Sequence, residues 1–270
     1  MIPIDLEGRV ILVCGVARGG IGGATARLIA AAGATVFAVD KAQELLDPTI
    51  ADIEAAGGRC FGLVADLTES AQTDPIIATV VQRFGRLDGV ANVAGGTRAE
   101  EWMKLEETPT SSFRATLNLN LEYVFRICRD AAAFMIKNKT GGSLVNVGSI
   151  SALTSAPYHA PYGAAKSGIS ALTRTMANEW MHHGIRANTV SPGAVATERV
   201  MSRATNPADG GAAAAPAVKF TSVDALGHTI VFLLSDLASG ISGQNIVVDS
   251  GISSAYCLGS VGLGTLAKNP

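Results

Sequence analysis

The sequence predicts an α/β fold in which a parallel sheet is covered by helices on both faces. Apolar runs of strand length alternate along the chain with longer, alanine-rich stretches of helical period. The expected strands are apolar throughout, which is typical of parallel strands buried on both faces. The composition is 48% hydrophobic and 16% charged, with 30 glycines, and it fits a fold with much buried sheet.

Seven strands are expected, at residues 9–14, 35–40, 59–64, 89–93, 144–147, 186–190 and 245–248. Helices are expected between them, at residues 21–32, 42–56, 72–84, 110–137, 161–183 and 223–236. No repeat or linker interrupts this pattern, so residues 1–270 are predicted to form one domain. Residues 204–217 are too rich in Pro, Gly and Ala to form a core, and they predict a flexible loop over about 197–220 that closes on a substrate.

Charge and cysteine content exclude several classes of protein. The formal net charge of -2 argues against a nucleic-acid or anionic-membrane partner. The cysteines are far apart and predict neither a disulfide framework nor a metal cluster; they are Cys14, Cys60, Cys128 and Cys257. Asp5 and Glu7 stand where a signal peptide would carry positive charge, and no apolar run approaches the roughly 18 residues that span a bilayer. A cytoplasmic protein is expected.

A glycine-rich turn follows the first expected strand, in the segment GVARGGIGGATA. Gly15, Gly20 and Gly22 open the next helix, where glycines let the backbone approach a pyrophosphate and the helix N-terminus attracts it. Glycines also make ordinary turns, but the position between a strand and a helix favours phosphate binding.

Asp40 ends the second expected strand, eighteen residues after Gly22. A carboxylate there can accept hydrogen bonds from an adenosine ribose and would repel a 2′-phosphate, which favours NAD over NADP. Lys41 could soften that preference, and Asp40 could instead be a helix cap or turn residue. Asp66 and Leu67 end the third strand, and residues 92–95 (NVAG) end the fourth, at the same expected ligand-binding edge.

Ser149, Tyr162 and Lys166 carry the expected chemistry. Tyr162 and Lys166 are four residues apart and share one face of the predicted helix after Pro161. An ammonium beside a phenol lowers the pKa of the phenol and makes it a usable acid/base. Ser149 follows a strand end, from which its hydroxyl could reach the oxygen that Tyr162 protonates. A Tyr-x-x-x-Lys pair is also common as an exposed helix pair, so the remaining motifs decide.

Taken together, these motifs closely resemble the short-chain dehydrogenase/reductase family over about residues 5–251. The resemblance includes Asn120 in NLNLEYVF, the Ser191-Pro192-Gly193 turn and SGQNIVVDSG at 242–251. It implies a doubly wound Rossmann-type fold with seven parallel strands in the order 3-2-1-4-5-6-7. It also implies hydride transfer between NAD(H) and a secondary alcohol or ketone, in a homotetramer or homodimer.

The resemblance assigns roles to residues of this chain. Tyr162 would be the acid/base, Ser149 would polarise the reacting oxygen, and Lys166 would lower the tyrosine pKa and bind the nicotinamide ribose. Asn120 would hold a water in a proton relay from Lys166. The residues expected to contact the cofactor are Gly15, Arg18, Gly20, Ile21, Gly22, Asp40, Asp66, Leu67, Asn92, Ala94, Gly95, Tyr162, Lys166, Pro192, Gly193, Val195 and Thr197.

The chain departs from the family pattern in the glycine-rich turn and at its end. Four residues lie between Gly15 and Gly20 instead of three, so Gly19 is an alternative equivalent of Gly20. The tail at residues 252–270 runs past the usual family end, and it could pack on a neighbouring subunit or be disordered.

The substrate is expected to be an apolar alcohol or ketone, because the predicted loop contains Val200, Met201 and Phe220. Tyr158 and His159 could line its pocket, although His159 could equally be an exposed loop residue. Trp102 and Met103 are assigned to the core in preference to the pocket wall. No histidine has metal-ligand spacing, so no metal is expected. The alternatives are a 3-oxoacyl-thioester reductase of the same family and a non-catalytic nicotinamide-binding sensor or scaffold.

Overall fold

The computed structural model describes residues 4–98, 101–198, 200–201 and 220–254, and it is built around one seven-stranded sheet. Neighbouring strands all pair in parallel, in the order β3-β2-β1-β4-β5-β6-β7. The predicted fold class and strand order are confirmed. The strands are β1 (Val10–Cys14), β2 (Thr35–Asp40), β3 (Arg59–Val64), β4 (Gly89–Asn92), β5 (Gly142–Val147), β6 (Ile185–Pro192) and β7 (Asn245–Val248).

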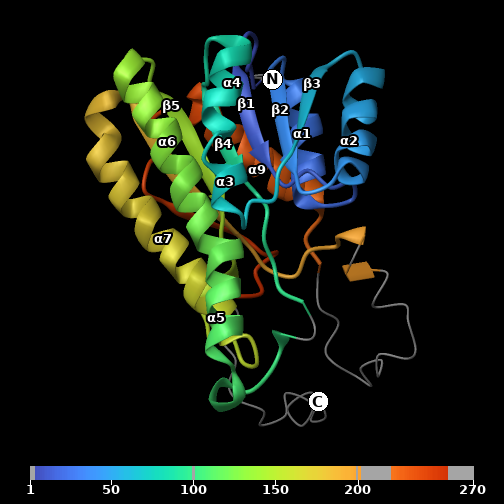
Figure 1. The fold of residues 1–270 in the computed structure, drawn as a ribbon, viewed down its shortest axis with the longest axis vertical. Helices are drawn as coiled ribbons and strands as arrows, with labels where there is room; N and C mark the ends of the chain where they lie inside the picture. The colour runs from blue at the N-terminus through green and yellow to red at the C-terminus, as the bar shows by residue number, and fades with distance from the viewer. Residues whose placement is uncertain (1–3, 99–100, 199, 202–219, 255–270) are drawn as a thin grey trace, which may run out of the picture.

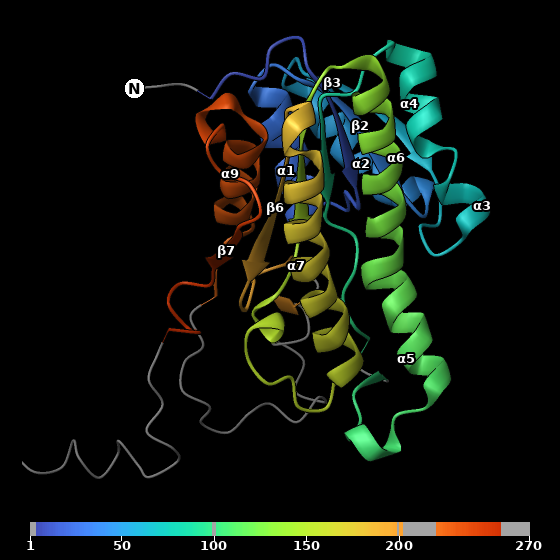
Figure 2. The ribbon, with the colours of Figure 1, turned by 90° about the vertical axis from the view of Figure 1, so that its left-hand side faces the viewer.

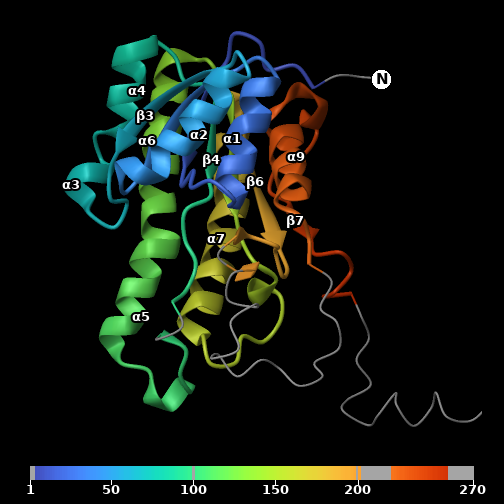
Figure 3. The same ribbon diagram turned by 90° about the vertical axis from the view of Figure 1, so that its right-hand side faces the viewer.

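Helices cover both faces of this sheet (Figure 1). One face carries α4, α6 and α7, and the other carries α1, α2 and α9, as the two side views show (Figures 2 and 3). The α-helices are α1 (Ile21–Ala31), α2 (Gln43–Ala55), α3 (Ser70–Thr73), α4 (Ile76–Phe84), α5 (Thr110–Leu117), α6 (Tyr123–Asn138), α7 (Ala160–Trp180) and α9 (Val223–Leu234). The shorter helical turns are η2 (Leu105–Glu107), η3 (Asn118–Glu122), η4 (Ile150–Ala152), η5 (Met181–His183) and η7 (Asp236–Ala238).

The inner strand β1 shows how one apolar run contributes to both cores. Successive side chains of a strand point to opposite faces. Val10, Leu12 and Cys14 pack toward α4, α6 and α7, whereas Ile11 and Val13 pack toward α1, α2 and α9. All five are buried, which explains why the strand is apolar throughout.

Two predicted helices differ in detail. The helix expected at 72–84 is two helices, because Pro75 lies between α3 and α4 as the N-cap of α4 and has no N–H to continue α3. The helix expected at 110–137 is continuous in direction but contains the π-turn η3, which separates α5 from α6. β5 begins two residues earlier than expected, and β6 extends to Pro192.

Other expectations fall partly beyond the described residues. The predicted loop at 197–220 is described only at its two ends, and the tail at 252–270 only as far as residue 254. Within the described part of the chain, no helix has the length and apolar character needed to cross a membrane.

Candidate active site

A cavity of about 740 Å³ opens at the carboxyl ends of β1, β2, β3 and β4. Its volume is within the usual range of ligand pockets, roughly 300–1,000 Å³. The expected cofactor residues that line it are Gly15, Arg18, Gly20, Ile21, Gly22, Asp40, Asp66, Leu67, Ala94, Gly95 and Thr197. Gly96, Thr97 and Glu198 also line it. They are not among the predicted residues, because only their adjacency to predicted residues distinguishes them in the sequence.

The glycine-rich turn leaves no room for side chains at two of its positions. A Cβ atom on Gly22 would lie 1.6 Å from the Gly15 carbonyl oxygen, and one on Gly15 would lie 2.7 Å from the Ala94 backbone. Gly20 is the N-cap of α1, whose first turn has no acidic residue. The turn and helix N-terminus therefore fit a pyrophosphate, which needs close backbone approach and a positive dipole. Gly20, and not Gly19, is the residue that caps the helix.

The extra glycine of the turn, Gly19, meets the loop that follows β6. Gly19 has a φ of 72°, and its carbonyl accepts a 3.1 Å hydrogen bond from the Glu198 amide. A Cβ on Gly19 would lie 2.8 Å from the Glu198 Cβ. The loop that follows β6 thus packs directly against the glycine-rich turn at Gly19.

The two strand-end carboxylates are held by backbone amides. Asp40 accepts hydrogen bonds from Val16 N–H at 2.8 Å and from Lys41 N–H at 2.9 Å, one on each oxygen. Each oxygen keeps a lone pair, so the carboxylate still has acceptors for ribose hydroxyls. Asp66 accepts from both the amide and the hydroxyl of Thr68, and these hydrogen bonds lower its pKa.

Some expected cofactor residues lie away from the cavity lining. The Asn92 side chain is buried in the core, where it donates to Asn146 Oδ1 at 2.9 Å and to Cys128 Sγ at 3.3 Å. Val195 is buried and forms a parallel bridge with Thr221. Pro192 ends β6, and Gly193 packs against Asp249, where a Cβ would lie 2.7 Å from the Asp249 Cβ.

Lys166 and Tyr162 lie on α7 beside the cavity. Pro161 stands in the first turn of α7, as expected. The Lys166 Nζ lies 5.5 Å from the centroid of the Tyr162 ring and donates a 2.8 Å hydrogen bond to the Val147 carbonyl. A Cβ on Gly95 would lie 3.5 Å from this Nζ, so the ammonium adjoins the cavity lining. Burial lowers the pKa of Lys166 to about 7.

Ser149 lies two residues past the end of β5, at the N-cap of η4. Its Oγ accepts from the Ser151 amide and donates to the Ser151 hydroxyl, both at 3.1 Å. The η4 turn packs on α7 at Gly163, where a Cβ would lie 3.2 Å from the Ser151 carbonyl oxygen. This close packing places the serine turn (residues 149–152) against Gly163, the residue that follows Tyr162.

Asn120 is fully buried within the π-turn η3. Its amide donates to the carbonyls of Gly96 and Thr116 at 3.0 Å, and its Oδ1 accepts from the Gly96 N–H at 2.8 Å. Both N–H donors are therefore used to hold the cavity wall at Gly96. The Asn120 side chain has no N–H left to donate to a water molecule. A water bound there would have to donate its own hydrogen bond to an oxygen atom of Asn120.

Trp102 differs from the sequence expectation. It is 55% exposed and not part of the core, and its ring stacks on His159. Among the described residues, no group of three or more His, Cys, Asp or Glu side chains is arranged to hold a metal ion.

Comparisons with known proteins match this geometry. Residues 15–253 match the family model described as enoyl-(acyl carrier protein) reductase. The chain is 34% identical over 247 residues to the 3-oxoacyl-[acyl-carrier-protein] reductase of Thermotoga maritima, covering 92% of this chain and 98% of that protein. It is 33% identical over 247 residues to the D-threitol dehydrogenase of Mycolicibacterium smegmatis, covering 91% and 93%.

A solved structure shares the whole architecture. The structure of a putative short-chain dehydrogenase/reductase from Burkholderia xenovorans superposes with a TM-score of 0.85 at 30% identity. The match covers 94% of this chain and 100% of that one. The fold is thus shared with that protein over nearly the whole chain.

We expect Lys166 to lose its proton near pH 7 in the protein without cofactor. Its folded pKa of about 7 is below the unfolded value of 10.5, so its buried charge costs stability below pH 7, and that cost disappears as the pH rises to 10.5. Selective labelling of the lysine ε-carbons with ¹³C and NMR titration will show one resonance with a midpoint near 7. That resonance should be missing from Lys166→Met, and a midpoint above 9 would contradict the expectation.

Proposed function

Because this chain belongs to the short-chain dehydrogenase/reductase family, we propose that it is an NAD-dependent oxidoreductase that interconverts a secondary alcohol and its ketone. One observation carries the proposal: Tyr162 and the buried Lys166 stand on α7 next to the serine turn, at the edge where the glycine-lined cavity opens. This is the arrangement that proton removal from an alcohol requires beside a dinucleotide site.

The chain's own residues supply the proton chemistry. In the oxidation direction, the Tyr162 phenolate accepts the alcohol proton, and the Ser149 hydroxyl donates a hydrogen bond to the reacting oxygen. The Lys166 ammonium stabilises the phenolate by opposite charge in a desolvated site. A phenolate in turn favours the charged form of Lys166, which burial alone disfavours.

The nicotinamide ring, when bound, supplies the acceptor or donor of the hydride. The residues that would hold the dinucleotide are the glycine-rich turn at its pyrophosphate, Asp40 at the adenosine ribose and Thr197 toward the nicotinamide. The carboxylate of Asp40, which faces the cavity, supports NAD over NADP.

A 3-oxoacyl-thioester reductase remains the second candidate, since a relative of that name matches nearly the full chain. The same Ser149, Tyr162 and Lys166 would protonate the 3-oxo group. Assays with a 3-oxoacyl thioester beside simple ketones separate the two substrates. A non-catalytic sensor would bind NAD without turnover of either.

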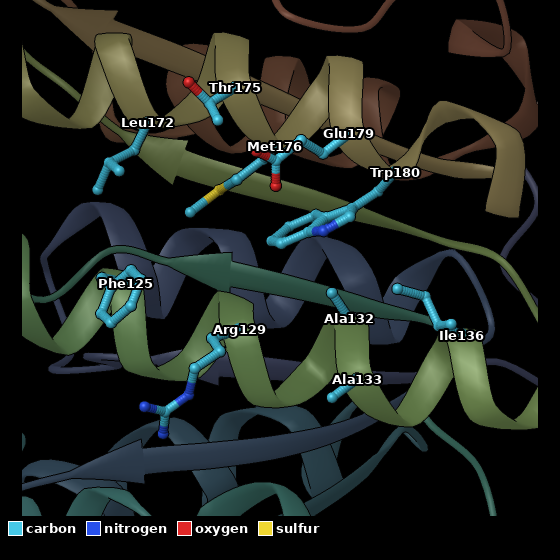
Figure 4. Close-up of a pocket in the computed structure, with 10 residues that line it drawn as sticks. All are labelled: Phe125, Arg129, Ala132, Ala133, Ile136, Leu172, Thr175, Met176, Glu179 and Trp180. Atoms are coloured by element: carbon cyan, nitrogen blue, oxygen red, sulfur yellow. The ribbon is translucent and has the colours of Figure 1, made fainter.

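We also propose that the protein is a homo-oligomer, a tetramer or a dimer. A groove of about 350 Å³ lies between α6 and α7 on the outer face of the molecule (Figure 4). Phe125, Leu172 and Trp180 line it, and Phe125 is 44% exposed. A second copy of the same helix pair would cover this apolar face by two-fold symmetry.

Replacing Tyr162 with Phe is expected to lower kcat for alcohol oxidation by about 10²–10⁴-fold, because the acid/base is lost while the ring remains. The measurement is NADH formation by absorbance over a panel of secondary alcohols. Tyr158→Phe removes a hydroxyl four residues earlier in the chain and should leave the rate within about twofold, since general acid/base catalysis does not use it. Equal rates for Tyr162→Phe and the wild type would exclude Tyr162 as the acid/base.

Replacing Asp40 with Asn is expected to raise the ratio of kcat/KM for NADP to that for NAD by about tenfold or more, because a charge facing the 2′-phosphate is removed. Asparagine keeps one oxygen to accept the Val16 N–H, which ties β2 to the glycine-rich turn, and loses only the acceptor of the exposed Lys41 N–H. Asp66→Asn makes the same charge change at the β3 end and should leave the ratio unchanged. If Asp40→Asn also leaves it unchanged, the ribose partner lies elsewhere.

Phe125→Glu is expected to convert the assembly into smaller species, because two-fold symmetry would bring two carboxylates into an apolar interface, where their desolvation is costly. Sedimentation velocity measures the change. Val64→Glu, an exposed apolar position at the end of β3, is the matched control and should sediment like the wild type. A single unaltered boundary for Phe125→Glu would place the interface on another face.

A further inference from the structure

A stacked pair of aromatic side chains stands next to the proposed acid/base. The Trp102 and His159 rings have centroids 4.9 Å apart with an interplanar angle of 20°. The centroids of the His159 and Tyr162 rings are in turn 6.0 Å apart, with an interplanar angle of 45°. The two residues come from segments that are far apart in sequence, one after β4 and the other before α7.

The pair is also connected to the cofactor cavity. The Trp102 indole N–H donates a 2.9 Å hydrogen bond to the Thr97 hydroxyl, and Thr97 lines that cavity. The stacked pair is therefore linked to the acid/base through His159 and to the cofactor cavity through Thr97. A ring bound at Tyr162 would meet this pair.

A strained backbone holds the pair in place. Tyr158 has a φ of 66°, which is unusual for a bulky side chain and marks functional sites. Its carbonyl accepts a 2.7 Å hydrogen bond from the Met103 amide, which ties the Trp102 segment to the loop before α7. The next residue, His159, is the N-cap of α7, and its carbonyl accepts from the Tyr162 amide at 3.0 Å. These two backbone hydrogen bonds hold His159 in place relative to both Trp102 and Tyr162.

The pair offers an uncovered apolar surface. Trp102 is 55% exposed although it is the largest apolar side chain type, and its one indole donor is already satisfied. Tyr158 and Leu153, in the loop that leads to His159, are also 60% and 53% exposed. The Trp102 ring therefore offers a planar face whose one donor is satisfied, and such a face favours stacking over hydrogen bonding.

We propose that Trp102 and His159 form a platform that selects substrates with a flat ring next to the reacting carbinol, such as aryl or other planar cyclic secondary alcohols and their ketones. This rests on the proposed function, in which Tyr162 takes the alcohol proton. The platform determines specificity by stacking on the substrate ring, and it takes no part in the proton transfer.

Three secondary alcohols with equal numbers of carbon atoms test the platform: 1-phenylethanol, 1-cyclohexylethanol and 2-octanol. The wild type is expected to have the highest kcat/KM for 1-phenylethanol. Trp102→Leu should lower that preference over 2-octanol by about three- to tenfold, which is the usual worth of an aromatic contact beyond its area. Trp102→Phe keeps a flat ring and should restore much of the preference.

Phe113→Leu is the matched control, since it removes another exposed aromatic ring, on α5. It should leave the ratio of the alcohols unchanged. If Trp102→Leu also leaves the ratio unchanged while the alcohols are still oxidised, the platform is overturned and the proposed function stands.

A binding measurement separates failure of the platform from failure of the proposed function. The chain has 2 tryptophans, Trp102 and Trp180, so Trp180→Phe leaves Trp102 as the only indole fluorophore. Acetophenone should quench its emission saturably, and 2-octanone should not. If no alcohol is oxidised but this quenching occurs, the platform is supported and the proposed reaction fails. If quenching is not saturable, the platform is overturned whatever the activity.

Discussion

The burial of Lys166 is the constraint on which the site depends. Its ammonium lies under the carboxyl end of β5, with a hydrogen bond to the Val147 carbonyl, and desolvation lowers its pKa to about 7. A buried lysine is costly unless something nearby stabilises its charge. The Tyr162 ring and the cavity edge at Gly95 are the neighbours that its Nζ reaches. Burial thus destabilises the Lys166 ammonium in the free protein, and an anionic group beside it would stabilise its charge.

A buried polar network keeps α7 in the position that this lysine requires. Asn92 on β4 donates to Asn146 on β5, which donates to Thr173 on α7 at 3.1 Å, and Thr189 on β6 donates to the same Thr173 hydroxyl at 2.9 Å. Each bond joins a different pair of elements, and all four side chains are buried. Loss of one member would leave buried polar groups unpaired, so the network specifies one register of α7 on the sheet. This gives Asn92 a structural role that explains its burial away from the cavity.

Local patterns predicted most of the fold and the outline of the site. Apolar runs located all seven strands, and the motifs shared with a known family supplied their order, which no local pattern contains. The break at Pro75 could have been foreseen from its missing N–H, but the apolar period on both sides concealed it. Boundaries such as the extension of β6 to Pro192 depend on pairing with β7, which is a contact between distant parts of the chain.

The sequence by itself determined which residues are expected to carry chemistry: the glycines of the turn, Asp40 at a strand end and the four-residue spacing of Tyr162 and Lys166. Spacing and residue type are sufficient there, because helix geometry and strand ends fix which side chains share a face or an edge. Only the tertiary structure decided that Asn92 faces the core, that Glu198 contacts Gly19, and that Trp102 is exposed and stacks on His159. Each of these is a contact between segments far apart in the chain, and its energy depends on packing that no local pattern encodes.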